Sequence, residues 1–368
     1  MMADFFDYIQ WRGDVPFYDN SITEVDGLIL STFSYITPTA EFLGRLPATI
    51  EELFQSIEKL SDKRKAKLIR TEDDLKLIEA MAGCDRFKNI KILSFKKITD
   101  KEKEMQFAAY CLELKQNFLA IVFRGTDHSI VGWKEDFNMG FMDTIPGQLQ
   151  AAKFLKKEMA KYEGNLIICG HSKGGNQAVY TAVTCDSKIE SRILGVYNYD
   201  GPGFSDEFVK SEQYQRLVDR IYSFLPDSSI VGLLFEHDEP VEVVESRNNG
   251  ILQHEPYSWN VMGNKIVRQE QRSNASFIID EAIHDWLDKL TSEQIKEFVG
   301  ILFGILDEEN IESLEDLVKV KNLIAARKKY SESSDEEKNV FSKSINQLAK
   351  SISTSMKNNR RQERESDN

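Results

Sequence analysis

The feature that most constrains this chain is an apolar run that ends in a serine flanked by glycines. Residues 165–183 read NLIICGHSKGGNQAVYTAV, so Gly170, Ser172 and Gly174 form the pattern G-x-S-x-G. An apolar strand before the serine and a helical pattern after it predict a sharp strand-to-helix turn. Such a turn strains the serine backbone and leaves no room for bulky residues two positions away on either side. We interpret Ser172 as a nucleophile, and the alternative is a plain turn without chemistry.

The segments that follow this turn alternate between strand and helix patterns. We expect strands at 165–169, 193–199 and 219–225, and helices at 175–183 and 207–216. Short links between these segments are typical of a parallel sheet covered by helices on both faces. The serine then lies at the carboxyl end of the sheet, where α/β proteins bind their ligands.

The strands expected before the turn are of a different kind. Residues 90–95, 105–114 and 118–124 are short, rich in β-formers and separated by charged turns, which indicates successive strands that pair as hairpins. A helix is expected at 148–162 and a last strand at 241–245. The whole pattern predicts a mostly parallel, mixed sheet flanked by helices.

The chain divides along its length by composition and periodicity. We expect a helical N-terminal segment at 1–86, packed on an α/β core at 87–290. Residues 291–356 predict a C-terminal helical extension, which begins with the capping-box spacing of TSEQ. Residues 357–368 contain no apolar side chain, so we expect them to be disordered.

The overall composition excludes several classes of protein. Hydrophobic residues make up 41% and charged residues 29% of the 368 positions, which is ordinary for a globular domain. The net charge of −13 argues against a nucleic-acid partner, because phosphate binding needs clustered cations. Neither a signal peptide nor a membrane-spanning run is evident, and four cysteines without metal-ligand spacing fit a reducing cytoplasm. We therefore expect a cytoplasmic protein without metal, cofactor or integral membrane association; its oligomeric state is open.

A nucleophilic serine needs a base, and in this architecture the chain order is serine, acid, histidine. The chain has five histidines, at positions 128, 171, 237, 254 and 284. His254 is the leading base because it ends a short apolar run and precedes Glu-Pro, which we interpret as a strand-to-loop transition. His237 is the alternative, although the acids around it indicate a solvated side chain.

Two carboxylates at expected strand ends are candidates for the acid that orients the base. Asp227 leads, because it follows the second strand after the serine and leaves room for one more strand before His254. Asp200 is the alternative, since it ends the first strand after the serine. Both residues also fit ordinary turn positions.

A strand ending in FRGT at 123–126, followed by GHSKGG and then by an acid and a histidine, resembles the class 3 lipases. That resemblance implies the α/β-hydrolase fold. It also implies an oxyanion hole made by Thr126 and by the backbone N–H of Lys173. Lipases often carry leucine where this chain has Lys173, whose charge would favour an anionic substrate unless the side chain points outward.

A closer resemblance is to an uncharacterised bacterial α/β-hydrolase family related to those lipases, over about residues 5–290. The shared segments are WRGD, a VDGLIL-like stretch, YNYDGPGF, a PDSSIVGLL-like segment and a QHEPYSW-like segment. The resemblance implies the fold and the catalytic machinery, but no substrate.

Together these features predict a serine hydrolase that cleaves a carboxylic ester, of a small or lipid-like molecule, through an acyl-enzyme. The alternatives are a thioesterase, amidase or peptidase with the same triad, or a binding protein that has the fold without the activity. Apolar residues after FRGT could build an acyl pocket or fill a covered loop, and those proposed for the pocket are Trp133, Phe137 and Phe141.

Overall fold

In the computed structural model the chain forms two compact units. The first comprises Met1–Ile98, Phe107–Gly125 and Gly147–Gln271, and the second comprises Thr99–Gln106, Thr126–Pro146 and Arg272–Asn368. The structure describes residues 3–17, 22–127, 144–227, 229 and 231–269, with scattered positions in 135–142 and 273–355. The linear domain boundaries expected from the sequence stay a prediction.

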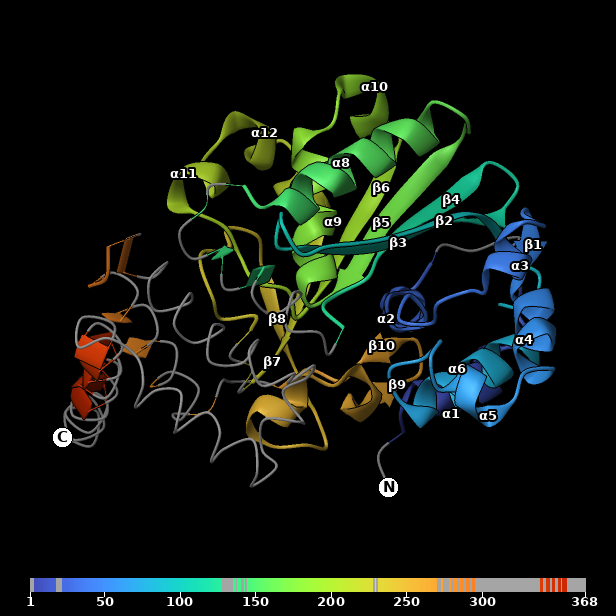
Figure 1. The fold of residues 1–368 in the computed structure, drawn as a ribbon, viewed down its shortest axis with the longest axis horizontal. Coiled ribbons are helices and arrows are strands. Elements are labelled where there is room, and N and C mark those ends of the chain that lie inside the picture. Colours follow the sequence, from blue (N-terminus) through green and yellow to red (C-terminus); the bar gives the residue numbers. More distant parts are fainter. Residues whose placement is uncertain are drawn as a thin grey trace. The chain divides into compact units, whose positions relative to one another are not determined.

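An eight-stranded sheet organises the fold, with its strands in the order of the sequence (Figure 1). Its strands are β1 (Ala48–Thr49), β2 (Lys91–Asp100), β3 (Met105–Lys115), β4 (Phe118–Phe123), β5 (Asn165–His171), β6 (Ile193–Tyr199), β7 (Ile221–Pro226) and β8 (Val241–Val244). A separate antiparallel pair consists of β9 (Val261–Met262) and β10 (Lys265–Ile266).

The sheet is mixed in the way the sequence predicts. Strands β4 to β8 pair in parallel, whereas β1 pairs with β2, and β3 with β4, in antiparallel fashion. Each expected strand between residues 90 and 245 is present, with ends that shift by a few residues. The parallel strands run to the same edge, so residues that follow β5, β6 and β7 meet there.

Helices precede, separate and follow these strands. In the N-terminal part they are α1 (Phe5–Arg12), α2 (Glu24–Phe33), α3 (Ala40–Leu43), α4 (Ile50–Glu58), α5 (Asp62–Lys65) and α6 (Glu72–Ala82). Between the parallel strands they are α8 (Pro146–Met159), α9 (Lys173–Thr184), α10 (Ser187–Glu190), α11 (Asp206–Val209) and α12 (Glu212–Gln215). The 3-10 helices in the described part of the chain are η1 (Val218–Arg220), η2 (Gly250–His254) and η3 (Pro256–Ser258).

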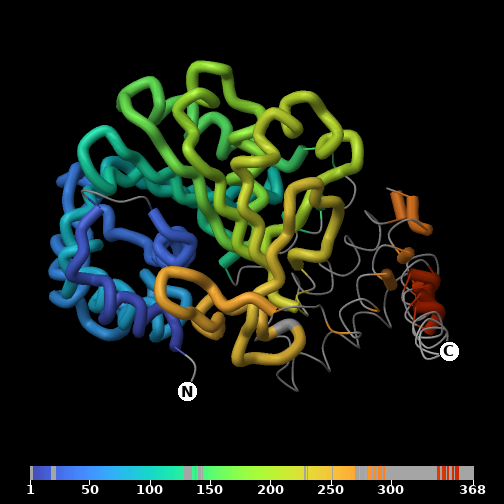
Figure 2. The backbone as a smooth tube through the Cα atoms, turned by 180° about the vertical axis from the view of Figure 1, so that it is seen from behind, coloured from blue at the N-terminus to red at the C-terminus, as the bar shows by residue number. Residues whose placement is uncertain are grey.

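The N-terminal helices begin where the sequence supplies caps. Thr23 and Thr49 each form a capping box with the acidic residue three positions later, and at Thr71 the Asp74 carboxylate accepts from the Thr71 backbone N–H. Such a box satisfies backbone N–H groups that a first helical turn leaves unpaired. The predicted helical character of this part of the chain is therefore confirmed. Figures 1 and 2 show these helices beside the β9–β10 pair, which α1 and α2 contact.

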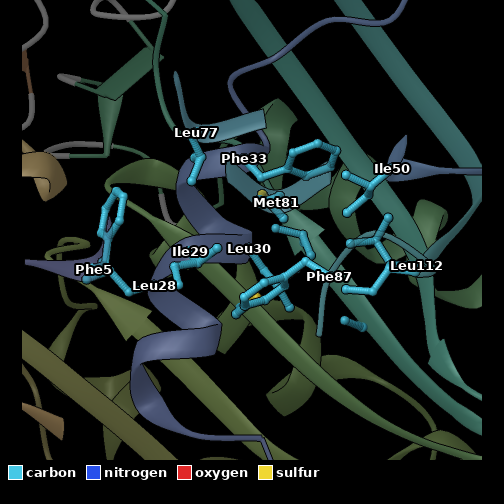
Figure 3. Packing of buried hydrophobic residues seen from close by; sticks show 14 of the residues in the cluster. Phe5, Leu28, Ile29, Leu30, Phe33, Ile50, Leu77, Met81, Phe87 and Leu112 are labelled. Atoms are coloured by element: carbon cyan, nitrogen blue, oxygen red, sulfur yellow. The ribbon is translucent and has the colours of Figure 1, made fainter. Parts of the chain in front are cut away.

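Two apolar cores cover the two faces of the sheet. Along β5, Leu166 and Ile168 belong to the core that includes α8 and α9, while Ile167 and Cys169 belong to the core that includes the N-terminal helices. This alternation follows from the two-residue period of a strand. Figure 3 shows the second core around α2, with Leu28, Leu30 and Phe33 among other apolar side chains.

The expected fold class is thus confirmed: the chain has an α/β-hydrolase fold, with a mostly parallel mixed sheet between two helical layers. The helical N-terminal addition is present. The proposed C-terminal extension and tail lie largely outside the described residues.

Candidate active site

Ser172 stands on a sharp turn between β5 and α9. Its φ of 59° and ψ of −135° lie in a region that residues other than glycine rarely adopt. The backbone N–H of Ser172 donates to the carbonyl of Tyr199 at 2.9 Å, which fixes the turn to the end of β6. As the N-cap of α9, Ser172 also lies at the positive end of a helix dipole. This is the strained strand-to-helix turn that the sequence predicts.

The two glycines of the G-x-S-x-G pattern are sterically required. A Cβ on Gly170 would come within 2.2 Å of the Gly174 backbone. A Cβ on Gly174 would come within 2.2 Å of the Phe123 carbonyl oxygen, at the end of β4. Strand and helix therefore approach each other more closely than any side chain at these positions would allow.

His254 and Asp200 form the one close histidine–carboxylate pair beside this turn among the described residues. His254 Nδ1 lies 2.6 Å from Asp200 Oδ2. Asp200 is fully buried and directly follows Tyr199, to which the Ser172 backbone is bonded. A carboxylate can accept but not donate, so the shared proton resides on Nδ1 and the Nε2 of a neutral His254 carries the lone pair.

Further contacts hold the Asp200 carboxylate in place. The Ser229 hydroxyl donates to the same Oδ2 at 2.7 Å. On the other side, a Cβ on Gly232 would come within 2.3 Å of Oδ1, so the loop that follows β7 packs directly against the carboxylate. Ser229 is therefore a site residue that the sequence analysis missed; a serine in a loop carries no signal for such a contact.

The acid beside His254 differs from the leading prediction. The partner is Asp200, the alternative acid, rather than Asp227, which follows β7 and is 7% exposed. Two features favour Asp200: it directly follows β6, the strand paired with β5, and its positive φ of 54° sets the direction in which its side chain leaves the strand end. Counting strands along the sequence reveals neither feature.

The local structure at His254 also differs from the expected strand-to-loop transition. His254 ends the 3-10 helix η2, and Glu255 is extended with ψ 113° before η3 begins at Pro256. A residue that precedes proline avoids the helical region, so the helical turn has to end at His254.

The alternative base, His237, is held by its neighbours instead of being solvated. Its Nδ1 lies 3.1 Å from Glu239 Oε1, and its Nε2 lies 2.9 Å from the carbonyl of Gly232. Both ring nitrogens are therefore engaged, and the side chain is 9% exposed.

The base lies against the residue that precedes the serine. His171 Nε2 is 2.8 Å from the His254 carbonyl oxygen, and the two imidazole rings lie 4.5 Å apart. Among the described residues, the hydrogen bonds of His254 use its Nδ1 and its carbonyl, and none involves Nε2. Contacts between a nucleophile and its base often tighten only when substrate binds.

The two residues predicted for the oxyanion hole, Lys173 and Thr126, belong to different units. Lys173 begins α9, and its side chain is buried at 1% exposure, so it does not point outward into solvent. Thr126 belongs to the second unit, where its hydroxyl donates to Asp136 at 2.5 Å. In the first unit the preceding Gly125 packs on the turn, because a Cβ there would come within 2.9 Å of Ser172 Cβ.

The remaining predictions concern the acyl pocket, metal binding and membrane-spanning segments. Trp133, Phe137 and Phe141, proposed for an acyl pocket, are not among the described residues. The described positions contain no group of three metal-ligating side chains. No helix in that part of the chain is both long and apolar enough to span a membrane.

The four cysteines are free thiols, and the one nearest the turn is inert. Burial raises the pKa of Cys169 to about 12, so the thiol stays protonated at neutral pH. Cys169 is fully buried in β5.

Comparisons with known proteins place the chain in a family. A search of curated proteins found no match. Among solved structures, a mutant of MDLA from Penicillium cyclopium is 14% identical, with a TM-score of 0.40, covering 67% of this chain and 84% of that chain. The M37 lipase is 17% identical, with a TM-score of 0.39, covering 59% and 70% respectively. These scores are too low to decide function. Residues 81–304, more than half of the sequence, match one family model, over strands β2 to β8 and the Ser172 turn. The chain thus belongs to the Mbeg1-like family.

Proposed function

We propose that the protein is a serine hydrolase that cleaves carboxylic esters of lipid-like or other small acyl substrates. Ser172 is the nucleophile, His254 the general base and Asp200 the acid that orients it. The observation that carries this proposal is the 2.6 Å contact between Nδ1 of the partly buried His254 and Oδ2 of the buried Asp200, next to the strained Ser172 turn. Buried titratable pairs beside a strained residue are typical of catalytic sites.

The reaction follows from the tautomer of the base. His254 Nε2 accepts the proton of the Ser172 hydroxyl while Oγ attacks the ester carbonyl carbon. The resulting imidazolium is stabilised by Asp200 and then protonates the leaving alcohol. Water attacks the acyl-enzyme with His254 again as base, which releases the acid and restores Ser172.

The oxyanion of each tetrahedral intermediate needs donors near the turn. One proposed donor is the backbone N–H of Lys173, the residue after the nucleophile and the first residue of α9. The Thr126 backbone N–H is the second proposed source, as the lipase resemblance implies, whereas the Thr126 hydroxyl donates to Asp136. A single such donor typically contributes about 3 kcal/mol to transition-state stabilisation.

The decisive experiment is covalent labelling of the whole protein with a fluorophosphonate probe. We expect wild type to be labelled, Ser172→Ala to be unlabelled, and Ser56→Ala to match wild type. Ser56 is the control because its hydroxyl donates to the nearby Leu53 carbonyl on α4, away from the Ser172 turn along the chain. Labelling of Ser172→Ala at the wild-type rate would contradict the proposed nucleophile. An unlabelled, folded wild type would favour a binding protein with this fold.

The class of acyl bond is a separate question with a separate measurement. Turnover of matched p-nitrophenyl ester, thioester and anilide substrates should be fastest for the ester. A thioester or anilide preference of more than about tenfold, or 1.4 kcal/mol in the barrier, would replace the proposed substrate class.

A further inference from the structure

His171 links the base to a tyrosine of the N-terminal segment. Its Nε2 is 2.8 Å from the His254 carbonyl oxygen, and its Nδ1 is 2.9 Å from the Tyr35 hydroxyl. Tyr35 lies just after α2, in the part of the chain that precedes the family match at 81–304. Both side chains are nearly buried, at 1% exposure for His171 and 3% for Tyr35.

The partners of His171 fix its tautomer. The His254 carbonyl can only accept a hydrogen bond, so Nε2 must carry the proton. A neutral imidazole then has its lone pair on Nδ1, which accepts the Tyr35 hydroxyl proton. Burial, with His254 and Arg70 nearby, holds the pKa of His171 well below its ordinary value, so the ring stays neutral. Tyr35 thereby sets the direction in which His171 donates.

Two more contacts join the N-terminal segment to the residues after His254. The Arg70 guanidinium lies 4.3 Å over the Tyr35 ring and 2.6 Å from Glu255 Oε1. The Tyr257 hydroxyl donates to Asp74 at 2.7 Å. Short polar contacts from Tyr35 through His171, from Arg70 and from Asp74 therefore reach residues 254, 255 and 257.

These contacts fix the base at two separate points. His171 holds the backbone carbonyl of His254, while Asp200 holds Nδ1 of its ring. With both points fixed, the ring has little freedom to rotate, and Nε2 keeps one direction. A general base loses most of its effect when it is misplaced by about 1 Å, which costs up to about 100-fold in rate.

We propose that Tyr35 and His171 are positioning residues for His254, so the N-terminal helical segment is a working part of the active site. This inference rests on the proposed serine hydrolase function. Neither residue touches the substrate; both act through the placement of the base.

The test compares two Tyr→Phe variants, each of which deletes one buried hydroxyl. Tyr35→Phe removes the donor to His171, whereas Tyr8→Phe removes a hydroxyl that donates to Asp26 at 2.9 Å. Both hydroxyls belong to the N-terminal segment, so both variants test for a general loss of stability. We expect Tyr35→Phe to lower the maximal fluorophosphonate labelling rate by about tenfold, with probe affinity within about twofold of wild type. Tyr8→Phe should lower the melting temperature and leave the labelling rate unchanged.

Substitutions of His171 separate its N–H donor from its bulk. Gln keeps an N–H group near the position of Nε2, whereas Leu keeps only the volume. We expect His171→Gln to label at least about tenfold faster than His171→Leu, since it can still donate to the His254 carbonyl. Equal labelling rates for these two variants would contradict the positioning role.

A spectroscopic measurement tests the tautomer without any activity. In protein labelled with ¹⁵N-histidine, the resonances that His171→Gln removes should report a neutral ring protonated at Nε2. A ring protonated at Nδ1 alone would direct a lone pair at the His254 carbonyl and overturn the inference.

The two proposals fail in different ways. If wild type is labelled at Ser172 but Tyr35→Phe labels as fast as Tyr8→Phe, the positioning role is wrong and the hydrolase proposal stands. If folded wild type is not labelled, the hydrolase proposal is overturned, and the positioning role with it.

Discussion

At the scale of single residues, we expect substitutions of the two carboxylates near the site to have very different effects on ester turnover. Asp200 contacts His254 and holds its tautomer, whereas Asp227 follows the next strand out. We expect Asp200→Asn to lower ester turnover by about 10³–10⁴-fold, because the amide no longer favours the proton on Nδ1. Asp227→Asn, the matched control, should stay within about tenfold of wild type. The measurement is kcat/KM on a p-nitrophenyl ester.

If Asp227→Asn lowered kcat/KM far more than Asp200→Asn, Asp227 would be the catalytic acid, as the sequence favours. The sequence indicates a carboxylate at the end of each of two neighbouring strands, and in the structure Asp200 directly follows β6 and Asp227 directly follows β7. It cannot reveal which one faces the base, since this depends on the positive φ of Asp200 and on the packing of Gly232 against it. Side-chain direction at a strand end is thus a property of the folded backbone and not of the local sequence.

At the scale of elements, the junction between β5 and α9 leaves no room for a methyl group. We expect Gly170→Ala to destabilise the protein by about 1–3 kcal/mol or more, because its Cβ meets backbone atoms of Gly174 that cannot move alone. Chemical denaturation measures this loss.

A second glycine supplies the control for that change. At Gly44 the nearest atom to an added Cβ lies at 3.5 Å, so Gly44→Ala should change stability by less than about 0.5 kcal/mol. A Gly170→Ala protein as stable as Gly44→Ala would mean that strand and helix are not in this close contact.

The N-terminal helices depend on a buried ion pair. Arg86 Nη2 lies 2.5 Å from Asp26 Oδ2, and both side chains are fully buried. Replacing Arg86 alone leaves the buried Asp26 carboxylate without the guanidinium that compensates its charge. We therefore expect Arg86→Met to destabilise the protein by about 3–5 kcal/mol. A thermal or urea unfolding curve measures the loss.

The control for Arg86 is an exposed ion pair, in which a lysine instead of an arginine pairs with an aspartate. Lys76 pairs with Asp73 at 2.7 Å on the surface of α6, where water screens the charges. Lys76→Met should leave the unfolding midpoint unchanged. If Arg86→Met behaves in the same way, the pair at Asp26 does not hold the N-terminal helices in place.

At the scale of the whole molecule, the sequence predicts the layers better than their long-range contacts. The strands and most helices follow from period and capping, which act within about ten residues. The contact of Tyr35 with His171 joins residues 136 positions apart, and that of Asp74 with Tyr257 joins residues 183 apart. No local pattern marks such partners, so the link between the N-terminal segment and the base had to come from the structure.

The pH dependence of stability is also a property of the whole molecule, and Glu239 makes a defined contribution to it. Burial works to raise the pKa of Glu239, but the charge and hydrogen bond of His237 and hydrogen bonds from Ser223 and Tyr214 lower it to about 2. A carboxylate whose pKa is lower in the folded state stabilises that state above its unfolded pKa. This stabilisation is lost as the pH falls from about 4.5 to about 2, and it amounts to at most about 3 kcal/mol.

Replacing the carboxylate should remove this dependence. We expect Glu239→Gln to be less stable than wild type at pH 7, and the difference to shrink as the pH falls from about 4.5 toward about 2, because wild-type Glu239 then becomes protonated as well. Urea unfolding at each pH measures the difference, and Glu207→Gln, at an exposed position of α11, should follow wild type throughout. A difference between Glu239→Gln and wild type that stays constant from pH 7 to the acid limit would show that Glu239 stabilises the fold by its shape and hydrogen bonds rather than by its charge.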